Sequence, residues 1–304
     1  MPPTFWRSKP PADFWRDKTV LVTGGTGTFG HAFARLILQR PIRALLIFSR
    51  DELKQMEMRR AFPDERVRFI IGDVRDLARI SDAAAEADVL IHAAALKQIT
   101  TCEANPSEAI AVNVRGSANV ATVVAQRHIP AIALSSDKAA APLNLYGATK
   151  LAMERLFLAA GASCTRYGNV VGSRGSAVEV FRWQKANGLP LTITDDRMTR
   201  FWITADQAAA FVAECIQKPA GHVYIPKLPS VRVMDLAEAI DPGGARQYVG
   251  PRKGEKLHEY LLAPDELMDL LTFEQLPHAS AYKSSDNPDW LTVEEIRDAL
   301  AALS

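Results

Sequence analysis

Tyr146 and Lys150 have the side chains and the spacing needed to take a proton from an alcohol. They stand four residues apart in the string YGATK, so a helix would place the phenol and the ammonium on one face. The ammonium would lower the pKa of the phenol, and the phenolate would accept the proton of a substrate hydroxyl. Ser136 stands ten residues earlier, directly after Ser135, at the end of an expected strand. This spacing also occurs by chance in surface helices, so its meaning depends on the rest of the chain.

A glycine-rich string between an expected strand and an expected helix has the spacing GxxGxxG. Its first glycine permits a tight turn, its second lets a pyrophosphate approach the backbone, and its third lets the helix pack closely on the strand. The N–H groups and the positive end of the helix would then hold the anion. The alternative is a tight turn without a ligand. We predict that a dinucleotide is bound by Gly24, Thr26, Gly27, Thr28, Phe29 and Gly30.

The residues after the second expected strand indicate which dinucleotide is bound. An NAD site usually has an acidic residue there, whereas this chain has Ser49 and Arg50, followed by Lys54. A hydroxyl and two cations suit the 2′-phosphate of NADP, because arginine offers phosphate a planar fork of donors. Asp51 keeps NAD open, and residues 50–54 would also suit a solvated helix face. We predict NADP.

Further cofactor contacts are expected after the next two strands. The carboxylate of Asp73 would accept a hydrogen bond from the adenine amine, with Val74 beside it. Ala93, Ala94 and Ala95 are small enough to let the cofactor lie against the backbone. Asn113 stands at the start of an expected helix. Its side chain would cap that helix, or support the lysine that lies beside the cofactor, or do both.

These residues are embedded in an alternation of short apolar runs and helical stretches. The runs, nearly continuous in hydrophobic residues, predict strands buried on both faces of a parallel sheet at 20–23, 44–49, 67–71, 89–92 and 131–135. Helices are predicted at 31–39, 76–87 and 117–126. The alternation predicts βαβ units and an α/β fold, a Rossmann-type doubly wound parallel sheet. We expect an NADP-binding domain over 17–170, with about 201–224 added. Beyond Val171 the elements become shorter and mixed, so 171–304 would form mainly a smaller, discontinuous substrate-binding domain.

Composition narrows the class of protein. The chain has 304 residues, of which 48% are hydrophobic, and a formal net charge of +1, so nothing indicates binding to nucleic acid or to a membrane surface. Three scattered cysteines fit a reducing cytoplasm, where we expect the protein to be located. The six histidines show no spacing of metal ligands, so no metal site is predicted.

Several longer strings carry a resemblance from about residue 17 to the end of the chain. They are 23–30, 48–55, 72–76, 92–97, 136–140, 145–150, 166–175, 198–204, 254–259 and 287–291. The chain resembles the extended short-chain dehydrogenases/reductases. More narrowly, it resembles the short UDP-N-acetylglucosamine 4,6-dehydratases, including the C5-inverting lyases of pseudaminic acid biosynthesis. It departs from that pattern at Gln98, where a histidine is expected, at Thr101 and Cys102, and at Lys253. The segment with Gln98, Thr101 and Cys102 borders the expected sugar site. The identity of the hexose and of its acyl group therefore stays open.

The resemblance implies a reaction that recycles its cofactor. C4 of the sugar is oxidised, water is eliminated across C5 and C6, and C6 is reduced, with NADP tightly held throughout. Lys138 is implied as the base for the C5 proton and Asp137 as the acid for the departing hydroxyl, beside Tyr146, Lys150 and Ser136. Lysine is a base only when neutral, and we expect burial and neighbouring Lys150 to disfavour its charge. The alternative is a solvated turn pair at 137–138.

The resemblance also implies contacts to a UDP-sugar and a homo-oligomer, either a dimer or a hexamer. The implied substrate contacts are Lys97, Asn169, Arg174, Thr199, Arg200, Lys227, Arg252 and Glu255. A C4 epimerase or a 4-keto reductase on the same scaffold would share Tyr146 and Lys150 but would have no use for the pair at 137–138. A non-enzymatic regulator that senses NADP would be expected to lose the tyrosine or the lysine.

Overall fold

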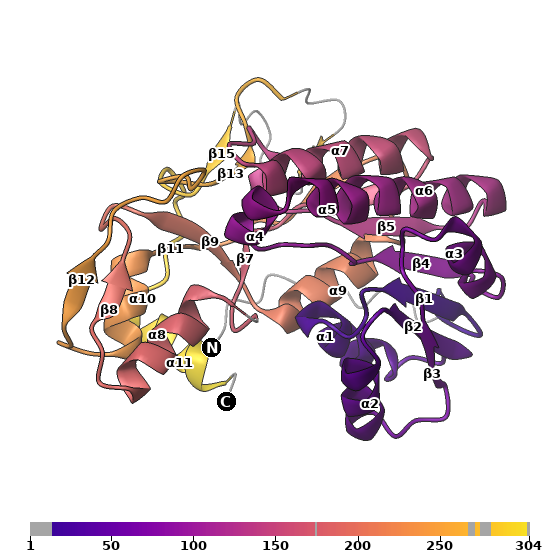
Figure 1. Ribbon diagram of the computed structural model, residues 1–304, viewed down its shortest axis with the longest axis horizontal. Helices are drawn as coiled ribbons and strands as arrows, with labels where there is room; N and C mark the ends of the chain where they lie inside the picture. Colours follow the sequence, from indigo (N-terminus) through magenta and orange to yellow (C-terminus); the bar gives the residue numbers. More distant parts are fainter. Residues whose placement is uncertain (1–13, 174, 267–270, 274–280, 303–304) are drawn as a thin grey trace.

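An eight-stranded, entirely parallel sheet dominates the molecule (Figure 1). The computed structural model describes residues 14–173, 175–266, 271–273 and 281–302. The strand order is β14-β10-β6-β5-β4-β1-β2-β3, with a crossover on each side of β1, so the sheet is doubly wound. The strands are β1 (Thr19–Thr23), β2 (Ala44–Ser49), β3 (Val67–Ile71), β4 (Val89–His92), β5 (Ala131–Leu134), β6 (Ser163–Thr165), β10 (Val223–Ile225) and β14 (Leu271–Phe273).

The predicted strands agree with the structure to within one residue at each end. β1, β2, β4 and β5 are buried along their whole length, as their continuous apolar runs indicate. β6, β10 and β14 were not predicted. They have only three residues each, too few for a pattern to separate a strand from other apolar segments.

Helices cover both faces of this sheet (Figure 1). On one face lie α1 (Thr28–Ile37), α2 (Glu52–Ala61) and α9 (Ala205–Cys215). On the other lie α3 (Leu77–Ala83), α6 (Gly116–Arg127) and α7 (Leu145–Ala159), with the short α4 (Ile99–Ala104) and α5 (Pro106–Ile110) at the edge. Side-chain caps fix where several of them begin. Asp51 caps α2, Asp76 caps α3 and Asn144 caps α7, each accepting a hydrogen bond from a backbone N–H of the first turn.

The smaller part of the molecule contains short strands and three helices. Its sheets are β7 (Asn169–Val170) with β9 (Thr199–Ile203) and β11 (Ser230–Arg232), β8 (Leu191–Ile193) with β12 (Arg246–Tyr248), and β13 (Tyr260–Leu262) with β15 (Tyr282–Lys283). The helices are α8 (Ala177–Ala186), α10 (Val233–Ile240) and α11 (Val293–Ala301).

Each of these two parts has a hydrophobic core among the described residues. The larger core fills both faces of the parallel sheet and includes α9 and β10. The smaller is formed by α8, α10, α11 and the strands β8 and β9. On this basis we propose the division into 17–170 with about 201–224 for the dinucleotide and mainly the remaining C-terminal residues for the substrate. Within the described ranges, every helix is too short or too polar to cross a lipid bilayer.

Candidate active site

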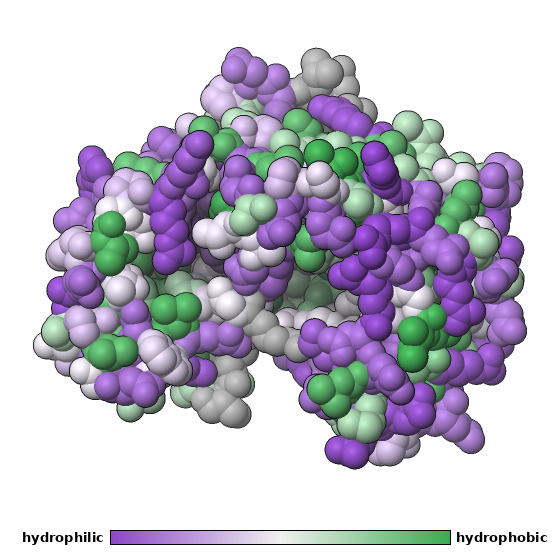
Figure 2. Space-filling model, viewed as in Figure 1, coloured by the Kyte–Doolittle hydropathy of each residue, from purple (hydrophilic) through white to green (hydrophobic). Residues whose placement is uncertain are grey.

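A single cavity of about 1200 Å³ runs from the glycine loop to the smaller part of the molecule. It opens at the carboxyl ends of the parallel strands, the usual ligand position in a doubly wound sheet. The surface is hollowed between α8 and the large sheet (Figure 2). The volume exceeds the 300–1,000 Å³ typical of a pocket for one drug-sized ligand. It is therefore large enough for a cofactor together with a substrate.

The glycine loop fits a dinucleotide pyrophosphate. Gly24 has φ +66°, and a Cβ there would lie 2.7 Å from the backbone of Ala94, so only glycine fits this turn. Gly27 begins α1 without a side-chain cap, which leaves the first N–H groups of the helix available to an anion. Of the predicted loop residues, Gly24, Thr26, Gly27, Thr28 and Phe29 line the cavity. Gly30 lies behind them, where a Cβ would overlap the carbonyl oxygen of Gly25.

The residues predicted to select NADP lie at one end of the cavity. Ser49, Arg50 and Lys54 all line it. Arg50 Nη1 lies 3.4 Å from Asp73 Oδ2, and Lys54 Nζ lies 2.6 Å from Asp51 Oδ2. The Lys54 ammonium and its hydrogen bonds to Asp51 hold the pKa of that carboxyl below its usual range. Asp73 does not line the cavity and instead accepts hydrogen bonds from Arg75, while Val74 does line it.

Asn113 does not cap a helix, contrary to one of the two interpretations. It lies inside a π-helical turn, Ala111–Arg115, between α5 and α6. Its side chain bonds the N–H and the carbonyl of Leu96 at 2.8 Å each, and donates to Thr149 on α7 at 3.0 Å. Because π turns form where a helix accommodates an extra residue, this one turns Asn113 toward the segment after β4. There Ala93, Ala94 and Ala95 line the cavity as predicted for small residues beside a cofactor.

Tyr146 and Lys150 both lie on α7 and line the cavity, but the electrostatics of the phenol differ from the prediction. Burial raises the pKa of Tyr146 to about 12, opposed by the Lys138 ammonium and by a hydrogen bond with Ser136. The Lys150 ammonium bonds a backbone carbonyl. Its Nζ donates to the Leu134 carbonyl at 2.7 Å, and burial lowers its own pKa to about 8. In this structure the cation that most lowers the pKa of the phenol is Lys138.

Asp137 and Lys138 form the centre of a buried charge cluster. A short 3-10 turn, Asp137–Ala139, begins at Ser136, whose hydroxyl caps it and donates to Asp137 Oδ1 at 2.8 Å. Lys138 Nζ lies 3.0 Å from Asp137 Oδ1 and 3.3 Å from Glu259 Oε1, and donates to Asn169 Oδ1 at 3.2 Å. Lys138 and Ser136 line the cavity, whereas Asp137 is fully buried behind them. The pair is thus no solvated surface turn.

The expectation that Lys138 is neutral is wrong for this structure. Burial alone would lower its pKa, but the carboxylates of Asp137 and Glu259 outweigh burial and raise the pKa above its usual value. Burial, with Glu259 adding to it, raises the pKa of Asp137. Asp137 Oδ2 is buried and accepts no hydrogen bond from any residue that the structure describes. The Lys138 amine therefore keeps its proton in this structure, next to the carboxyl group of Asp137.

The predicted substrate residues divide into those that reach the cavity and those that do not. Lys97, Asn169, Arg200, Arg252 and Glu255 line it, together with Gln98 and Lys253. Thr199 does not, because its hydroxyl bonds His258 and Ser284 inside the smaller part. Lys227 pairs with Asp289 at 2.8 Å, also away from the cavity. Arg174 lies outside the described residues.

Sequence reasoning did not identify Glu259 and Tyr167, which also line the cavity. Glu259 belongs to a string that carries the resemblance, but no spacing relates it to Lys138. Tyr167 directly precedes Gly168, and burial raises its pKa well above the usual value.

Comparisons with known proteins identify the family of the chain. Residues 20–281 match the family described as polysaccharide biosynthesis protein. A Campylobacter jejuni protein named UDP-N-acetylglucosamine 4,6-dehydratase (inverting) is 39% identical, over 93% of this chain and 97% of its own. A Rickettsia akari protein named UDP-glucose 4-epimerase is 38% identical, over 83% of this chain and 79% of its own. The crystal structure of Pen from Bacillus thuringiensis has a TM-score of 0.85 and 32% identity, covering 95% of this chain and 99% of that one. The chain therefore belongs to the polysaccharide biosynthesis protein family, as an extended short-chain dehydrogenase/reductase of the 4,6-dehydratase type.

Proposed function

We propose that this protein removes water from a UDP-N-acetylhexosamine, most simply UDP-N-acetylglucosamine, and yields the 4-keto-6-deoxy sugar nucleotide with inverted C5. The observation that carries the proposal is the Asp137–Lys138 pair, joined at 3.0 Å at the cavity wall beside Tyr146. A dehydratase needs an acid and a base besides the phenol, and an epimerase does not. The similarity to the Campylobacter protein supports the same reaction.

The pair accounts for both proton transfers of the elimination. A proton moving from Lys138 Nζ to Asp137 Oδ1 would produce a neutral amine and a carboxylic acid in one step. The amine then takes the C5 proton, and the acid protonates the departing C6 oxygen, which restores the original ion pair. Asp137 itself does not reach the cavity, so Ser136, whose hydroxyl touches both Asp137 and Tyr146, would relay its proton. No external acid or base is consumed.

The residues at the other end of the cavity would hold a nicotinamide cofactor, which when bound supplies reversible two-electron oxidation. The glycine loop would take the pyrophosphate, and Tyr146 would take the proton of the C4 hydroxyl. Lys150 donates a hydrogen bond to the backbone carbonyl of Leu134 at the end of β5. We propose NADP as the cofactor and a homo-oligomer as the working form.

Replacing Arg50 by alanine should weaken NADP binding about tenfold and change NAD binding less than about threefold, because only NADP offers arginine a phosphate. Calorimetric titration of the purified protein with each dinucleotide measures both. Arg59→Ala, at the far end of α2 and outside the cavity, is the matched control and should bind both normally. An equal loss of both affinities in Arg50→Ala would contradict the choice of NADP.

Incubation with UDP-N-acetylglucosamine, without added reductant, tests the reaction itself. We expect a product lighter by one water in the mass spectrum. The epimerase names among the relatives make C4 epimerisation the second candidate. It would give a new isomer of unchanged mass, and that result would replace the dehydratase proposal.

A further inference from the structure

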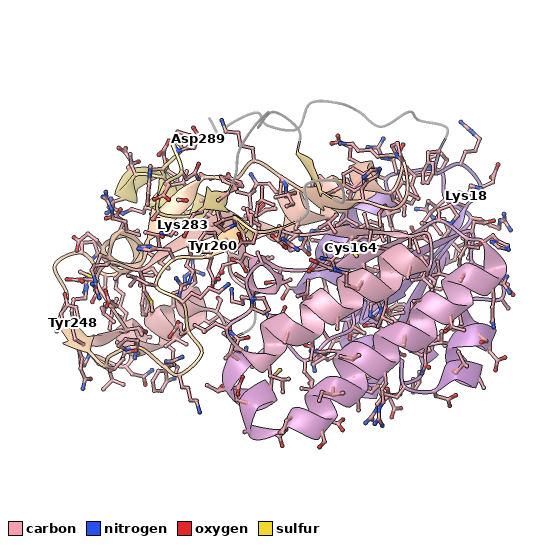
Figure 3. The ribbon with its side chains drawn as sticks, turned by 90° about the horizontal axis from the view of Figure 1, so that it is seen from above. Lys18, Cys164, Tyr248, Tyr260, Lys283 and Asp289 are labelled. Atoms are coloured by element: carbon pink, nitrogen blue, oxygen red, sulfur yellow. The ribbon has the colours of Figure 1, made fainter. Side chains whose placement is uncertain are left out.

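Glu259 is a buried carboxylate that the chain fixes rigidly against the catalytic pair. It is 2% exposed and directly precedes β13. Its N–H donates to Ser284 Oγ at 3.0 Å, and its carbonyl accepts from Ser284 N at 2.9 Å. In Figure 3 the next residue, Tyr260, lies between Cys164 of the large sheet and Tyr248 of the smaller part. Glu259 itself lines the cavity, together with residues of both parts of the molecule.

The contacts of its carboxylate are poorly suited to stabilising the fold. Oε1 lies 3.3 Å from Lys138 Nζ, and Oε2 lies 3.8 Å from Lys256 Nζ. Oε2 is buried and accepts no hydrogen bond from the part of the chain that the structure describes. Burying a carboxylate with one oxygen so poorly satisfied is unfavourable even beside cations. A charge retained under these conditions, in contact with a reacting group, points to a functional role.

We infer that Glu259 is the positioning residue of the acid–base pair: its carboxylate holds Lys138 at the cavity wall and determines the pH range in which Lys138 and Asp137 act. The inference rests on the proposed function. The charged groups that face Glu259 are Lys138 and Asp137 on the catalytic turn, Arg200 on β9 and Lys256 on its own segment. Arg200 is itself paired with Glu255 at 3.4 Å, and Tyr146 faces the cluster through Lys138 and Asp137.

Removing the charge of Glu259 should change the pKa values of Lys138 and Asp137 in the same direction. Its negative charge raises the pKa of Lys138 and also raises that of Asp137. In Glu259→Gln both values fall, so the amine becomes neutral at lower pH and the acid also loses its proton at lower pH. Because activity needs a neutral Lys138 and a protonated Asp137, both limbs of the profile should move to lower pH, by about one unit. Above the wild-type optimum, kcat should fall about tenfold.

The experiment compares wild type, Glu259→Gln, Glu259→Asp and the matched control Asp265→Asn, an exposed carboxylate on the same segment. The first readout is kcat for loss of water from UDP-N-acetylglucosamine against pH. The second, which needs no turnover, is the rate at which acetic anhydride acetylates Lys138 against pH, followed by mass spectrometry. Acetic anhydride reports the amine directly because it reacts only with the neutral form.

We expect Glu259→Gln to shift both profiles to lower pH and to raise Lys138 acetylation about tenfold at neutral pH. Glu259→Asp, which keeps the charge, should retain the wild-type pH range with a lower kcat, and Asp265→Asn should match wild type. A uniform loss of kcat with unshifted profiles and unchanged acetylation would assign Glu259 a purely structural role and overturn the inference. If Glu259→Gln does not fold, a shifted pH range in Glu259→Asp overturns it instead. Failure of wild type to release water would refute the proposed function, while the acetylation profiles would still decide the role of Glu259.

Discussion

Replacement of Lys138 by methionine should lower kcat for dehydration by about 10³-fold, within the 10²- to 10⁴-fold range of a positioned general base. Methionine has a similar length but has no amine to take the C5 proton. It also leaves the carboxyl groups of Asp137 and Glu259 without the cation between them. Because both are buried, the free energy of unfolding should fall by about 3 kcal/mol, the lower end of the range for a broken buried pair. Product formation and urea denaturation measure the two effects.

Lys138→Arg separates these two roles. Arginine keeps a cation between the two carboxylates, but it does not lose its proton at any pH an enzyme tolerates. It should therefore restore most of the stability and little of the dehydration. Recovery of dehydration to within about tenfold of wild type would show that Lys138 supplies charge and not a base.

Replacement of Tyr146 by phenylalanine should lower kcat about 10³-fold while leaving the fold intact. The phenol is 8% exposed and its hydroxyl bonds Ser136, so phenylalanine fills the same space and loses only the group that accepts the C4 proton. Oxidation at C4 precedes every later step, so no partial product should appear. Mass spectrometry of the reaction mixture, with thermal denaturation alongside, measures both effects.

Tyr167→Phe is the matched control for Tyr146→Phe. It removes a second phenol hydroxyl from the wall of the same cavity, where burial has raised the pKa of that group as well. We expect kcat to fall no more than about tenfold. Equal losses in the two variants would mean that neither hydroxyl is the specific proton acceptor.

The fold was largely predictable from sequence because its signals are local. Continuous apolar runs gave β1 to β5 nearly to the residue, and the glycine spacing predicted the turn between β1 and α1. The segment 99–115 was missed since it consists of two short helices and a π turn, and no periodic pattern distinguishes these. The three outer strands of the large sheet depend on partners distant in the chain.

The site was predictable in its residue types but not in its electrostatics. Tyr146, Lys150 and Lys138 line the cavity, as their predicted roles require. The charge of Lys138 was not predicted, because it depends on Glu259, which approaches from a segment that sequence alone cannot place beside Lys138. Likewise, Thr199 lies within a string that carries the resemblance and Lys227 was implied as a substrate contact, yet both bond within the smaller part.

The proposed function requires Lys138 to take the C5 proton of a bound sugar and Asp137 to supply the proton of the departing C6 hydroxyl. Both proton transfers are tested by NMR of the product that forms from UDP-N-acetylglucosamine in deuterium oxide. We expect a 4-keto-6-deoxy product of inverted C5, with one deuterium at C5 and none at C6. A product that retains the C6 hydroxyl, or one that has lost water but carries no deuterium at C5, would contradict the proposed function.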